Sequence, residues 1–234
     1  MSDNKTFLCI IPARGGSKSI PNKNLVDING RPLIYYSIKA VKDSNIFDKL
    51  MVNTDSKKIA TIAKKYGAEV PFFRPKYLST DKSLVQDVFV HALKFIEKKD
   101  KKYDYVCLVQ PTTPLIIPND FCNMVSILEK KNAKMVVSVT KTPCNINWVG
   151  RLSKKGSMEN FSKRKIYDTL KEHFEETYLL NGAIYMGEWD IFYNRMNFYS
   201  NKTYAYIMPN ERSVDIDSYF DLETVRYLMR KRYE

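Results

Sequence analysis

FLCIIPARGGSKSIPNKNL, residues 7–25, contains the two features that decide the fold class. Its five apolar residues 7–11, stopped by Pro12, are typical of a short and fully buried β-strand. A loop rich in glycine and cationic residues follows at once. Because α/β proteins bind ligands in loops at the carboxyl ends of their strands, we expect this strand to deliver residues 12–25 to a binding crevice.

The composition of this loop indicates an anionic ligand. Gly15 and Gly16 allow positive φ angles and a close approach of backbone N–H groups to an anion, while Arg14, Lys18 and Lys23 add three cations. The spacing matches neither the GxxxxGK[ST] nor the GxGxxG phosphate-binding pattern. We therefore expect an irregular loop and its side chains to hold a polyphosphate, the alternative being a solvent-exposed basic turn.

Length and composition indicate a soluble globular protein. At 234 residues the chain is one large domain or one domain with a small appendage, and 44% of its residues are apolar and 27% charged. No apolar run approaches the roughly 20 residues of a membrane span, and the apolar run before Pro12 is too short for a signal peptide. We therefore expect a cytoplasmic protein without a membrane partner.

The net charge of +12 makes nucleic acid a candidate ligand, because basic proteins attract polyanions. The lysines, however, are spread along the chain rather than gathered in one arm, and no RNA-binding or helix-turn-helix signature is present. We expect no nucleic-acid partner.

The cysteines and histidines argue against a zinc site. The four cysteines form no Cys-x-x-Cys pair and two lie in apolar strand-like runs, so we expect buried free thiols in a reducing compartment. Only two histidines are present, so a bound metal would be held by carboxylates. These residues are Cys9, Cys107, Cys122, Cys144, His91 and His173.

Apolar periodicity predicts alternating strands and helices along most of the chain. The predicted strands are 7–11, 49–55, 69–73, 105–109, 135–140, 179–186 and 203–208. The predicted helices are 32–43, one through Ile59, Ile62 and Ala63 that Asp55 or Ser56 caps, 84–98, 118–130, 189–195 and 218–232. Such alternation implies a mostly parallel sheet covered by helices on both faces.

The alternation breaks between Lys141 and Tyr178. This stretch has weak periodicity, several glycine, proline and asparagine residues, and many charges of both signs. We interpret it as a β-ribbon and loop inserted into the main domain.

Two carboxylates near the end of the chain are candidate metal ligands. Asp215 and Asp217 are separated by one residue, so in an extended segment they point to the same side. Together with a phosphate oxygen they could hold Mg²⁺, which takes a few oxygen ligands and keeps several waters. The alternative is that Asp217, or Asp221 together with Ser218, caps the final helix.

Two further polar motifs fall at predicted strands. Gln110-Pro111-Thr112-Thr113-Pro114 follows the strand 105–109 and offers an amide and hydroxyls between two prolines. Asn181-Gly182 lies within a strand, where glycine indicates a bulge or a close ligand approach. A rigid turn and a packing device are the respective alternatives.

Five motifs spread over nearly the whole chain resemble the acylneuraminate cytidylyltransferases, also called CMP-sialic acid synthetases. They are ARGGSKxIPxKN at 13–24, RP…LSTD at 74–81, QPTTPL at 110–115, NGAIY at 181–185 and SVDID at 213–217. The resemblance implies an α/β, Rossmann-like three-layer nucleotidyltransferase fold, with the catalytic domain in residues 1–140 and 187–234 and an inserted dimerisation and substrate segment at 141–186. It also implies a homodimer.

The resemblance further implies a reaction that uses CTP and Mg²⁺. The anomeric hydroxyl of a 2-keto sugar acid attacks the α-phosphorus of CTP, which releases pyrophosphate and gives the CMP-sugar. Phosphoryl transfer of this kind needs positioning and charge neutralisation rather than a covalent nucleophile, and the cationic loop and the two aspartates would supply both.

The roles of single residues also come from the resemblance. CTP would be bound by Arg14, Gly15, Ser17, Lys18, Lys23, Asn24, Arg74 and Ser83. The sugar acid would be bound by Gln110, Lys171 and Asn181, and the metal by Asp215 and Asp217. Catalysis would depend on Arg14, Lys18, Lys23 and Asp217.

One departure from the family concerns the sugar acid. Leu179 stands where the family usually has an arginine that pairs with the sugar carboxylate, and Lys171 stands where it has another. A lysine supplies charge but not a bidentate fork, so we expect rearranged carboxylate binding, through Lys171, Arg164 or Lys165. N-acetylneuraminate or a close relative is the leading substrate; the alternatives are legionaminate, pseudaminate or a 3-deoxy-octulosonate, or a nucleotide-binding module without catalysis.

Overall fold

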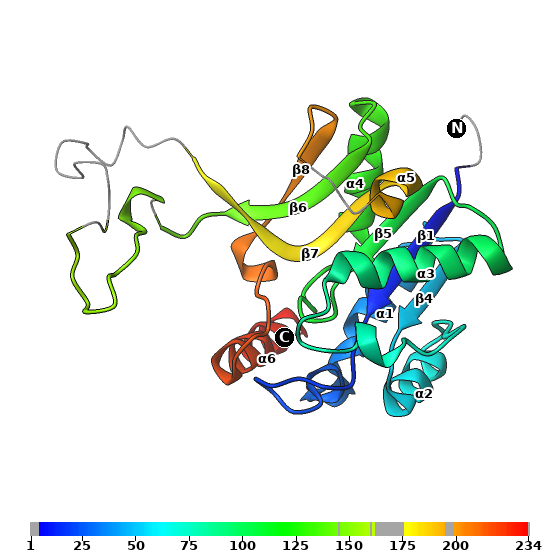
Figure 1. Ribbon diagram of the computed structural model, residues 1–234, viewed down its shortest axis with the longest axis horizontal. Helices are drawn as coiled ribbons and strands as arrows, with labels where there is room; N and C mark the ends of the chain where they lie inside the picture. Colours follow the sequence, from blue (N-terminus) through cyan, green and yellow to red (C-terminus); the bar gives the residue numbers. More distant parts are fainter. Residues whose placement is uncertain (1–4, 145, 160, 162–175, 195–198, 234) are drawn as a thin grey trace.

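The computed structural model describes residues 5–144, 146–159, 161, 176–194 and 199–233. Its centre is a six-stranded sheet in the order β4-β1-β5-β7-β6-β8 (Figure 1). The strands are β1 (Phe7–Pro12), β4 (Lys49–Asn53), β5 (Tyr105–Val109), β6 (Met135–Lys141), β7 (Tyr178–Glu188) and β8 (Thr203–Met208). Only β7 runs antiparallel to its neighbours in this sheet, so the predicted mostly parallel sheet is confirmed.

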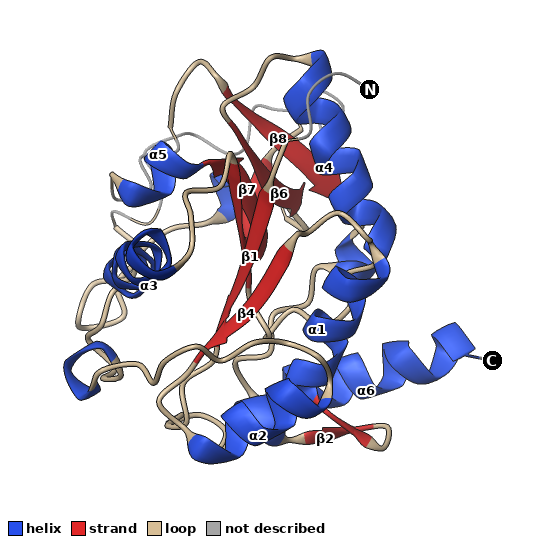
Figure 2. Cartoon of the chain, turned by 90° about the vertical axis from the view of Figure 1, so that its right-hand side faces the viewer, coloured by secondary structure: helices blue, strands red, loops and turns tan. Residues whose placement is uncertain are grey.

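Helices cover both faces of this sheet and form a three-layer α/β fold (Figure 2). Five helices follow the strands: α1 (Leu33–Asp43), α2 (Lys57–Lys65), α3 (Val85–Lys99), α4 (Pro118–Lys130) and α5 (Trp189–Tyr193). Alternate residues of β1 enter different cores, since Cys9 packs with α1, α2 and α4 whereas Leu8 packs with α3 and α5. This burial on both faces explains why the first apolar run is continuous rather than alternating.

A third apolar cluster brings the end of the chain next to its beginning. The last helix, α6 (Tyr219–Tyr233), contributes Leu222 and Val225 to a cluster with Ile20 of the cationic loop and Ile216. A small hairpin of β2 (Asp27–Ile28) and β3 (Arg31–Pro32), with Asn29-Gly30 as the turn between its strands, precedes α1. Residues 215–217 are thereby held beside the cationic loop.

One predicted strand is wrong. Residues 69–73 form only two isolated bridges to the edge of the sheet, Met51 to Glu69 and Thr54 to Phe73. Pro71 lies between these bridges and has no N–H to donate to a ladder, which explains why no continuous strand forms.

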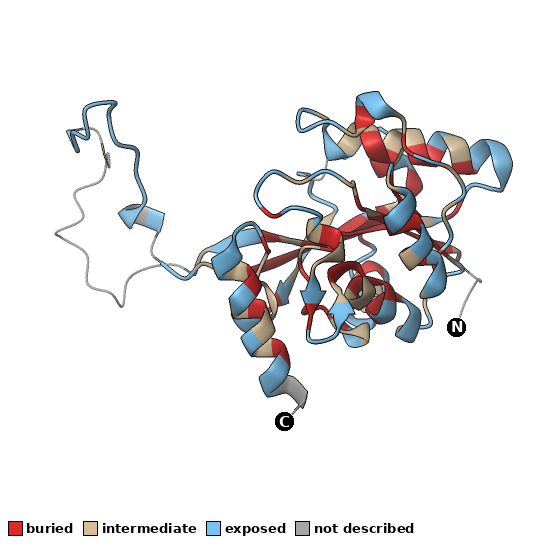
Figure 3. Ribbon diagram, turned by 90° about the horizontal axis from the view of Figure 1, so that it is seen from below, coloured by how far each residue is buried: buried red, intermediate tan, exposed pale blue. Residues whose placement is uncertain are grey.

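The predicted inserted segment extends away from the sheet as an exposed arm (Figures 1 and 3). Between Thr142 and Phe161 its described residues contain one short 3-10 helix, η3 (Ile146–Trp148), and otherwise turns and loops. The predicted β-ribbon is otherwise largely outside the described residues, as are Lys171, Arg164 and Lys165. Residues 178–186, assigned to the same segment, form most of β7 in the central sheet. The role of the segment in dimerisation stays a prediction.

The four cysteines were expected to be free thiols. All four cysteines lie in the described chain and are free; Cys9 and Cys107 are buried, as predicted, whereas Cys122 and Cys144 are exposed.

Among the described residues, no helix combines the length and the apolar character that crossing a bilayer requires.

Candidate active site

Three segments of the chain enclose a cavity of about 300 Å³ at the carboxyl ends of β1 and β5. The cationic loop, residues 12–24, lines one side, and residues 74–88 and 110–112 line the rest. Seven of the predicted nucleotide-binding and sugar-binding residues line this cavity: Arg14, Ser17, Lys23, Asn24, Arg74, Ser83 and Gln110. The structure therefore brings together residues that the sequence places far apart.

The cationic loop is held in shape by hydrogen bonds between side chains and its backbone. The N–H of Gly15 donates to Oδ1 of Asp55 at 2.8 Å, and Nδ2 of Asn24 donates to the carbonyl of Arg14 at 3.0 Å. Ser56, not Asp55, caps α2, so Asp55 is free for this contact. The Asn24 side chain is buried and its Oδ1 has no partner among the described residues, which suits a hydroxyl donor from a ligand.

Asp81 contacts two of the cations that were predicted to bind phosphate. Its Oδ1 lies 2.8 Å from Nη2 of Arg14, and its Oδ2 lies 2.8 Å from Nζ of Lys18. The hydrogen bond from Lys18 is the largest cause that holds the pKa of the Asp81 carboxyl below its ordinary value. The resemblance assigns the loop 74–83 to contact with the cytosine, and it implies no contact of Asp81 with these cations.

Arg74 presents a fixed guanidinium to the same cavity. Its side chain is buried, and it donates from Nε to Oδ1 of Asn53 at 3.0 Å and from Nη2 to the Asn53 carbonyl at 2.5 Å. Burial, opposed by the nearby Asp55 carboxylate and assisted by the positive charge of Arg14, lowers the pKa of Arg74 to about 10. The group therefore remains cationic at neutral pH.

Lys23 connects the cationic loop to the late aspartates. Its Nζ donates to the carbonyl of Ile216 at 2.5 Å and to Oδ1 of Asp217 at 3.0 Å. The N–H of Ile216 donates to the carbonyl of Thr112 at 2.9 Å, and the Ile216 side chain is fully buried. Asp215 and Asp217 thus flank a residue that is anchored on both its backbone and its side chain.

The helix cap predicted as an alternative role for this motif is provided by Ser218 and Asp221, since the N–H of Asp221 donates to the Ser218 hydroxyl at 3.3 Å. Oδ2 of Asp221 accepts hydrogen bonds from the N–H groups of Ser218 and Asp217, at 2.7 and 3.1 Å, and from the Ser218 hydroxyl. The backbone of Asp217 takes part in this cap, but its carboxylate does not. The cap therefore does not engage the carboxylates of Asp215 and Asp217, and Asp217 keeps its contact with Lys23.

These two carboxylates fit a magnesium ion. Oδ1 of Asp215 is buried and has no hydrogen-bond partner in the described structure. Burial raises the pKa of Asp215 against an opposing hydrogen bond from the Thr112 side chain, and the charge of Asp217 raises it further, which is the situation that a bound cation relieves. Among the described residues no group of three or more His, Cys, Asp or Glu could hold a metal, so substrate oxygens and water would complete the coordination.

Gln110 and Asp215 approach each other across Gly182. A Cβ built on Gly182 would lie 3.5 Å from Nε2 of Gln110 and 3.4 Å from Oδ2 of Asp215, and the glycine has a φ of +71°. The positive φ would strain any side chain at this position. The approach of Gln110 to Asp215 places a predicted sugar-binding residue next to a predicted metal ligand.

Asn181 is buried and its amide is already hydrogen-bonded. Its Oδ1 accepts from the Ser138 hydroxyl at 2.7 Å, and its Nδ2 donates to Oγ of Ser213 at 3.0 Å. These bonds connect β7 and β6 to the segment that carries the aspartates. Its predicted sugar contact stays a prediction, and Leu179, also on β7, is exposed.

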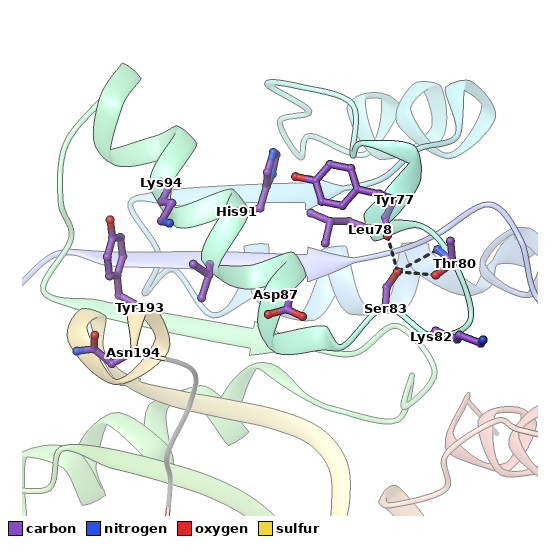
Figure 4. Close-up of a pocket in the computed structure, with 11 residues that line it drawn as sticks. Tyr77, Leu78, Thr80, Lys82, Ser83, Asp87, His91, Lys94, Tyr193 and Asn194 are labelled. Atoms are coloured by element: carbon purple, nitrogen blue, oxygen red, sulfur yellow. Dashed lines mark hydrogen bonds between the residues drawn. The ribbon is translucent and has the colours of Figure 1, made fainter.

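A second cavity, of about 880 Å³, lies on the other side of the loop 76–83 (Figure 4). Tyr77, His91 and Lys94 line it, and Tyr193 closes one end (Figure 4). Leu78, Thr80 and Ser83 line both cavities, so the loop separates them.

Sequence reasoning missed Asp81, Asn53 and the ion pair of Asp120 with Arg212, whose partners are distant in sequence. The available signal for Asp81 was a carboxylate in a motif assigned to nucleotide binding. Asn53 gave a weaker signal, a polar residue at the end of a buried strand.

The chain is similar to known cytidylyltransferases. A family model described as Cytidylyltransferase matches residues 8–232. The chain is 34% identical to CMP-N,N'-diacetyllegionaminic acid synthase of Legionella pneumophila over 97% of this chain and 98% of that protein. It is 31% identical to pseudaminic acid cytidylyltransferase of Campylobacter jejuni over 97% of each chain.

Two further matches extend this comparison. The chain is 31% identical to N-acylneuraminate cytidylyltransferase of Escherichia coli, over 97% of this chain and 52% of that protein. Among solved structures, a CMP:2-keto-3-deoxy-manno-octonic acid synthetase complexed with CTP matches with a TM-score of 0.72 at 17% identity, covering 97% of this chain and 100% of that one. The latter likeness supports the Rossmann-like nucleotidyltransferase fold.

Proposed function

Because the chain belongs to the cytidylyltransferase family, we propose that it transfers CMP from CTP to the anomeric hydroxyl of a nine-carbon sugar acid of the sialic acid class. The products are pyrophosphate and a CMP-activated sugar. The bond between Lys23 and Asp217 carries the proposal, since it sets the carboxylates suited to a metal beside the cations suited to a triphosphate.

The cationic side of the cavity would bind CTP. Arg14, Lys18 and Lys23 would neutralise the phosphates, and the backbone around Gly15 and Ser17 would contact them. The unpartnered Oδ1 of Asn24 would accept a hydrogen bond from a ribose hydroxyl. Arg74 and Ser83, on the opposite wall, would contact the base.

The two aspartates beside the cavity, which Asp217 reaches through Lys23, would organise the reaction. Asp215 and Asp217 would hold Mg²⁺, and the ion would neutralise charge that develops on the phosphates. Gln110, next to Asp215, would position the sugar acid so that its anomeric oxygen bonds to the α-phosphorus. The bond from that phosphorus to the bridging oxygen breaks, pyrophosphate leaves, and the proton of the hydroxyl passes to a base.

The identity of the sugar acid is the more specific part of the proposal. The relatives described above that match over nearly their whole length are named for legionaminic and pseudaminic acids, and one that matches over 52% of its length is named for N-acylneuraminate. These acids share the nine-carbon 2-keto framework, so we infer this class and rank a 3-deoxy-octulosonate below it. Leu179 removes a possible carboxylate-binding guanidinium from β7, so Lys171 remains the candidate counter-ion of the sugar carboxylate.

We also infer a homodimer in a reducing compartment, the cytoplasm. The arm that leaves the sheet exposes the apolar side chains Ile146, Trp148, Val149, Leu152 and Met158, a density of apolar surface typical of an interface. Four free cysteines are typical of a reducing compartment. Analytical ultracentrifugation of the protein tests the dimer directly.

A pyrophosphate-release assay tests the function. The protein would be incubated with CTP, Mg²⁺ and, in turn, N-acetylneuraminate, N,N'-diacetyllegionaminate, pseudaminate and a 3-deoxy-octulosonate. We expect release with at least one nine-carbon acid and loss of that release when the metal is chelated. Binding of CTP without turnover across this panel would instead support a nucleotide-binding module.

A further inference from the structure

We propose that Asp81 is a placeholder for the pyrophosphate part of CTP. It pairs with Arg14 and Lys18 in the nucleotide-free protein, is displaced by the β- and γ-phosphates, and returns to these cations as pyrophosphate leaves. This inference rests on the proposed function, because it takes Arg14 and Lys18 as ligands of the triphosphate.

The geometry of the contact resembles that of a bound phosphate group. The two oxygens of one carboxylate reach two different cations, each at 2.8 Å. Non-bridging phosphate oxygens make charge-assisted contacts of the same length. Asp81 and Arg14 line the same cavity. The Asp81 carboxylate therefore occupies space that a triphosphate would fill, and it pairs with cations that the triphosphate would bind.

The strength of the contact suits a group that can be displaced. The side chain of Lys18 is 84% exposed and that of Asp81 is 42% exposed, so water screens the attraction. The β- and γ-phosphates carry several negative charges and offer more acceptor oxygens than one carboxylate. The phosphates should therefore displace Asp81 from Arg14 and Lys18.

The loop around Asp81 is fixed independently of this contact. The hydroxyl of Ser83 accepts from the N–H of Thr80 at 3.1 Å and donates to the carbonyl of Tyr77 at 3.1 Å (Figure 4). These bonds bracket residue 81, so its side chain can rotate away without unfolding the loop. Asp81 is thereby suited to return to the same position after each turnover.

This arrangement has a consequence that a merely structural ion pair would not have. If Asp81 competes with phosphate, then removing its charge should strengthen the binding of pyrophosphate-containing ligands and leave the binding of an uncharged nucleoside unchanged. If the pair only holds the loop in place, the same change should weaken binding or leave it unaltered.

The experiment compares wild-type protein, Asp81→Asn and a control, Asp190→Asn, by titration calorimetry with Mg²⁺ present. Asp190 pairs with Lys102 on the surface, and its replacement changes the net charge by the same amount. The probes are CTP, inorganic pyrophosphate and cytidine. We expect Asp81→Asn to bind CTP and pyrophosphate about twofold to fivefold more tightly, the scale of an exposed ion pair, with cytidine unchanged and the control like wild type.

Two outcomes would contradict the inference, and they can be told apart. If wild-type protein binds CTP but Asp81→Asn binds pyrophosphate no more tightly, the placeholder role is wrong and the proposed function stands. If wild-type protein does not bind CTP, the proposed function fails and this inference fails with it.

Discussion

The ammonium group of Lys23 lies 3.0 Å from a carboxylate oxygen of Asp217, although the two residues are 194 positions apart in the chain. The same ammonium also binds the carbonyl of Ile216. The first loop and the last extended segment of the protein therefore share one charged contact. Changes on either side of this contact should affect catalysis more than folding.

Replacing Asp217 by alanine should leave the fold intact and lower the rate of pyrophosphate release by at least about a hundredfold, the scale for loss of a charge-stabilising group. The Asp217 side chain is 80% exposed, so little packing is lost. Steady-state kinetics and thermal unfolding monitored by circular dichroism measure the two effects. Glu223→Ala is the control, because Glu223 lies on α6 and pairs with Arg226 at the surface. Near-normal turnover in Asp217→Ala would contradict the metal assignment.

A buried ion pair supports the segment that carries both aspartates. Asp120 on α4 accepts hydrogen bonds from Nη1 of Arg212 at 2.6 Å and from the hydroxyl of Tyr206 at 2.7 Å, and it has 1% of its side chain exposed. Arg212 ends the short helix η6 (Asn210–Arg212), which leads directly to Asp215. This pair thus fixes the direction in which the segment leaves the sheet.

Arg212→Met should lower the free energy of unfolding by about 3–5 kcal/mol, because it leaves the Asp120 carboxylate buried without a counter-charge. The double variant Asp120→Asn, Arg212→Met should recover much of this loss, since no unpaired charge remains. Urea unfolding of both variants measures the difference. Equal stability of the single and double variants would show that the charge of Asp120 is not the cause.

The parts of the fold that depend on local sequence could be predicted, and the parts that depend on distant partners could not. The run 7–11 identifies β1 because a strand buried on both faces must be continuously apolar. The wrong strand at 69–73 is an exception, because Pro71 is itself a local signal against a strand and was outweighed by the apolar pattern. Apolar pattern alone was therefore insufficient at the sheet edge.

The same distinction applies to the site. The cationic loop was recognisable because Gly15 and its cationic neighbours are adjacent in sequence. Asp55 and Asp81 act on that loop from other parts of the chain, and their partners depend on how β4 and the loop 76–83 pack. A single sequence carries no signal for such contacts beyond the presence of a carboxylate.

The cysteines should differ in reactivity. Burial raises the pKa of the Cys107 thiol well above its ordinary value, and Cys9, its neighbour across the β1–β5 pair, is equally buried. Cys122 and Cys144 are exposed. A chromogenic disulfide reagent at pH 8 should therefore titrate two thiols in the native protein and four in denaturant. Rapid reaction of all four without denaturant would contradict the burial of Cys9 and Cys107.

Replacing Asp215 by asparagine should stabilise the protein at neutral pH while it removes activity. Burial raises the pKa of the Asp215 carboxyl, so the folded state binds this proton more strongly than the unfolded state does. The ionised form present at pH 7 therefore costs stability, and this cost disappears as the pH falls through the raised pKa toward the ordinary value of about 3.9. Asparagine keeps the shape and removes the charge.

Urea unfolding of wild-type protein and Asp215→Asn at pH 7 and at pH 4 tests this argument. We expect a higher midpoint for Asp215→Asn at pH 7 and a smaller difference at pH 4, together with a loss of pyrophosphate release of about a hundredfold or more. Asp217→Asn is the matched control: its carboxylate is exposed and paired with Lys23, so its removal should bring no gain in stability. A lower midpoint for Asp215→Asn at pH 7 would mean that the Asp215 carboxylate stabilises the fold, and the buried oxygen would then need a partner within the protein rather than a metal.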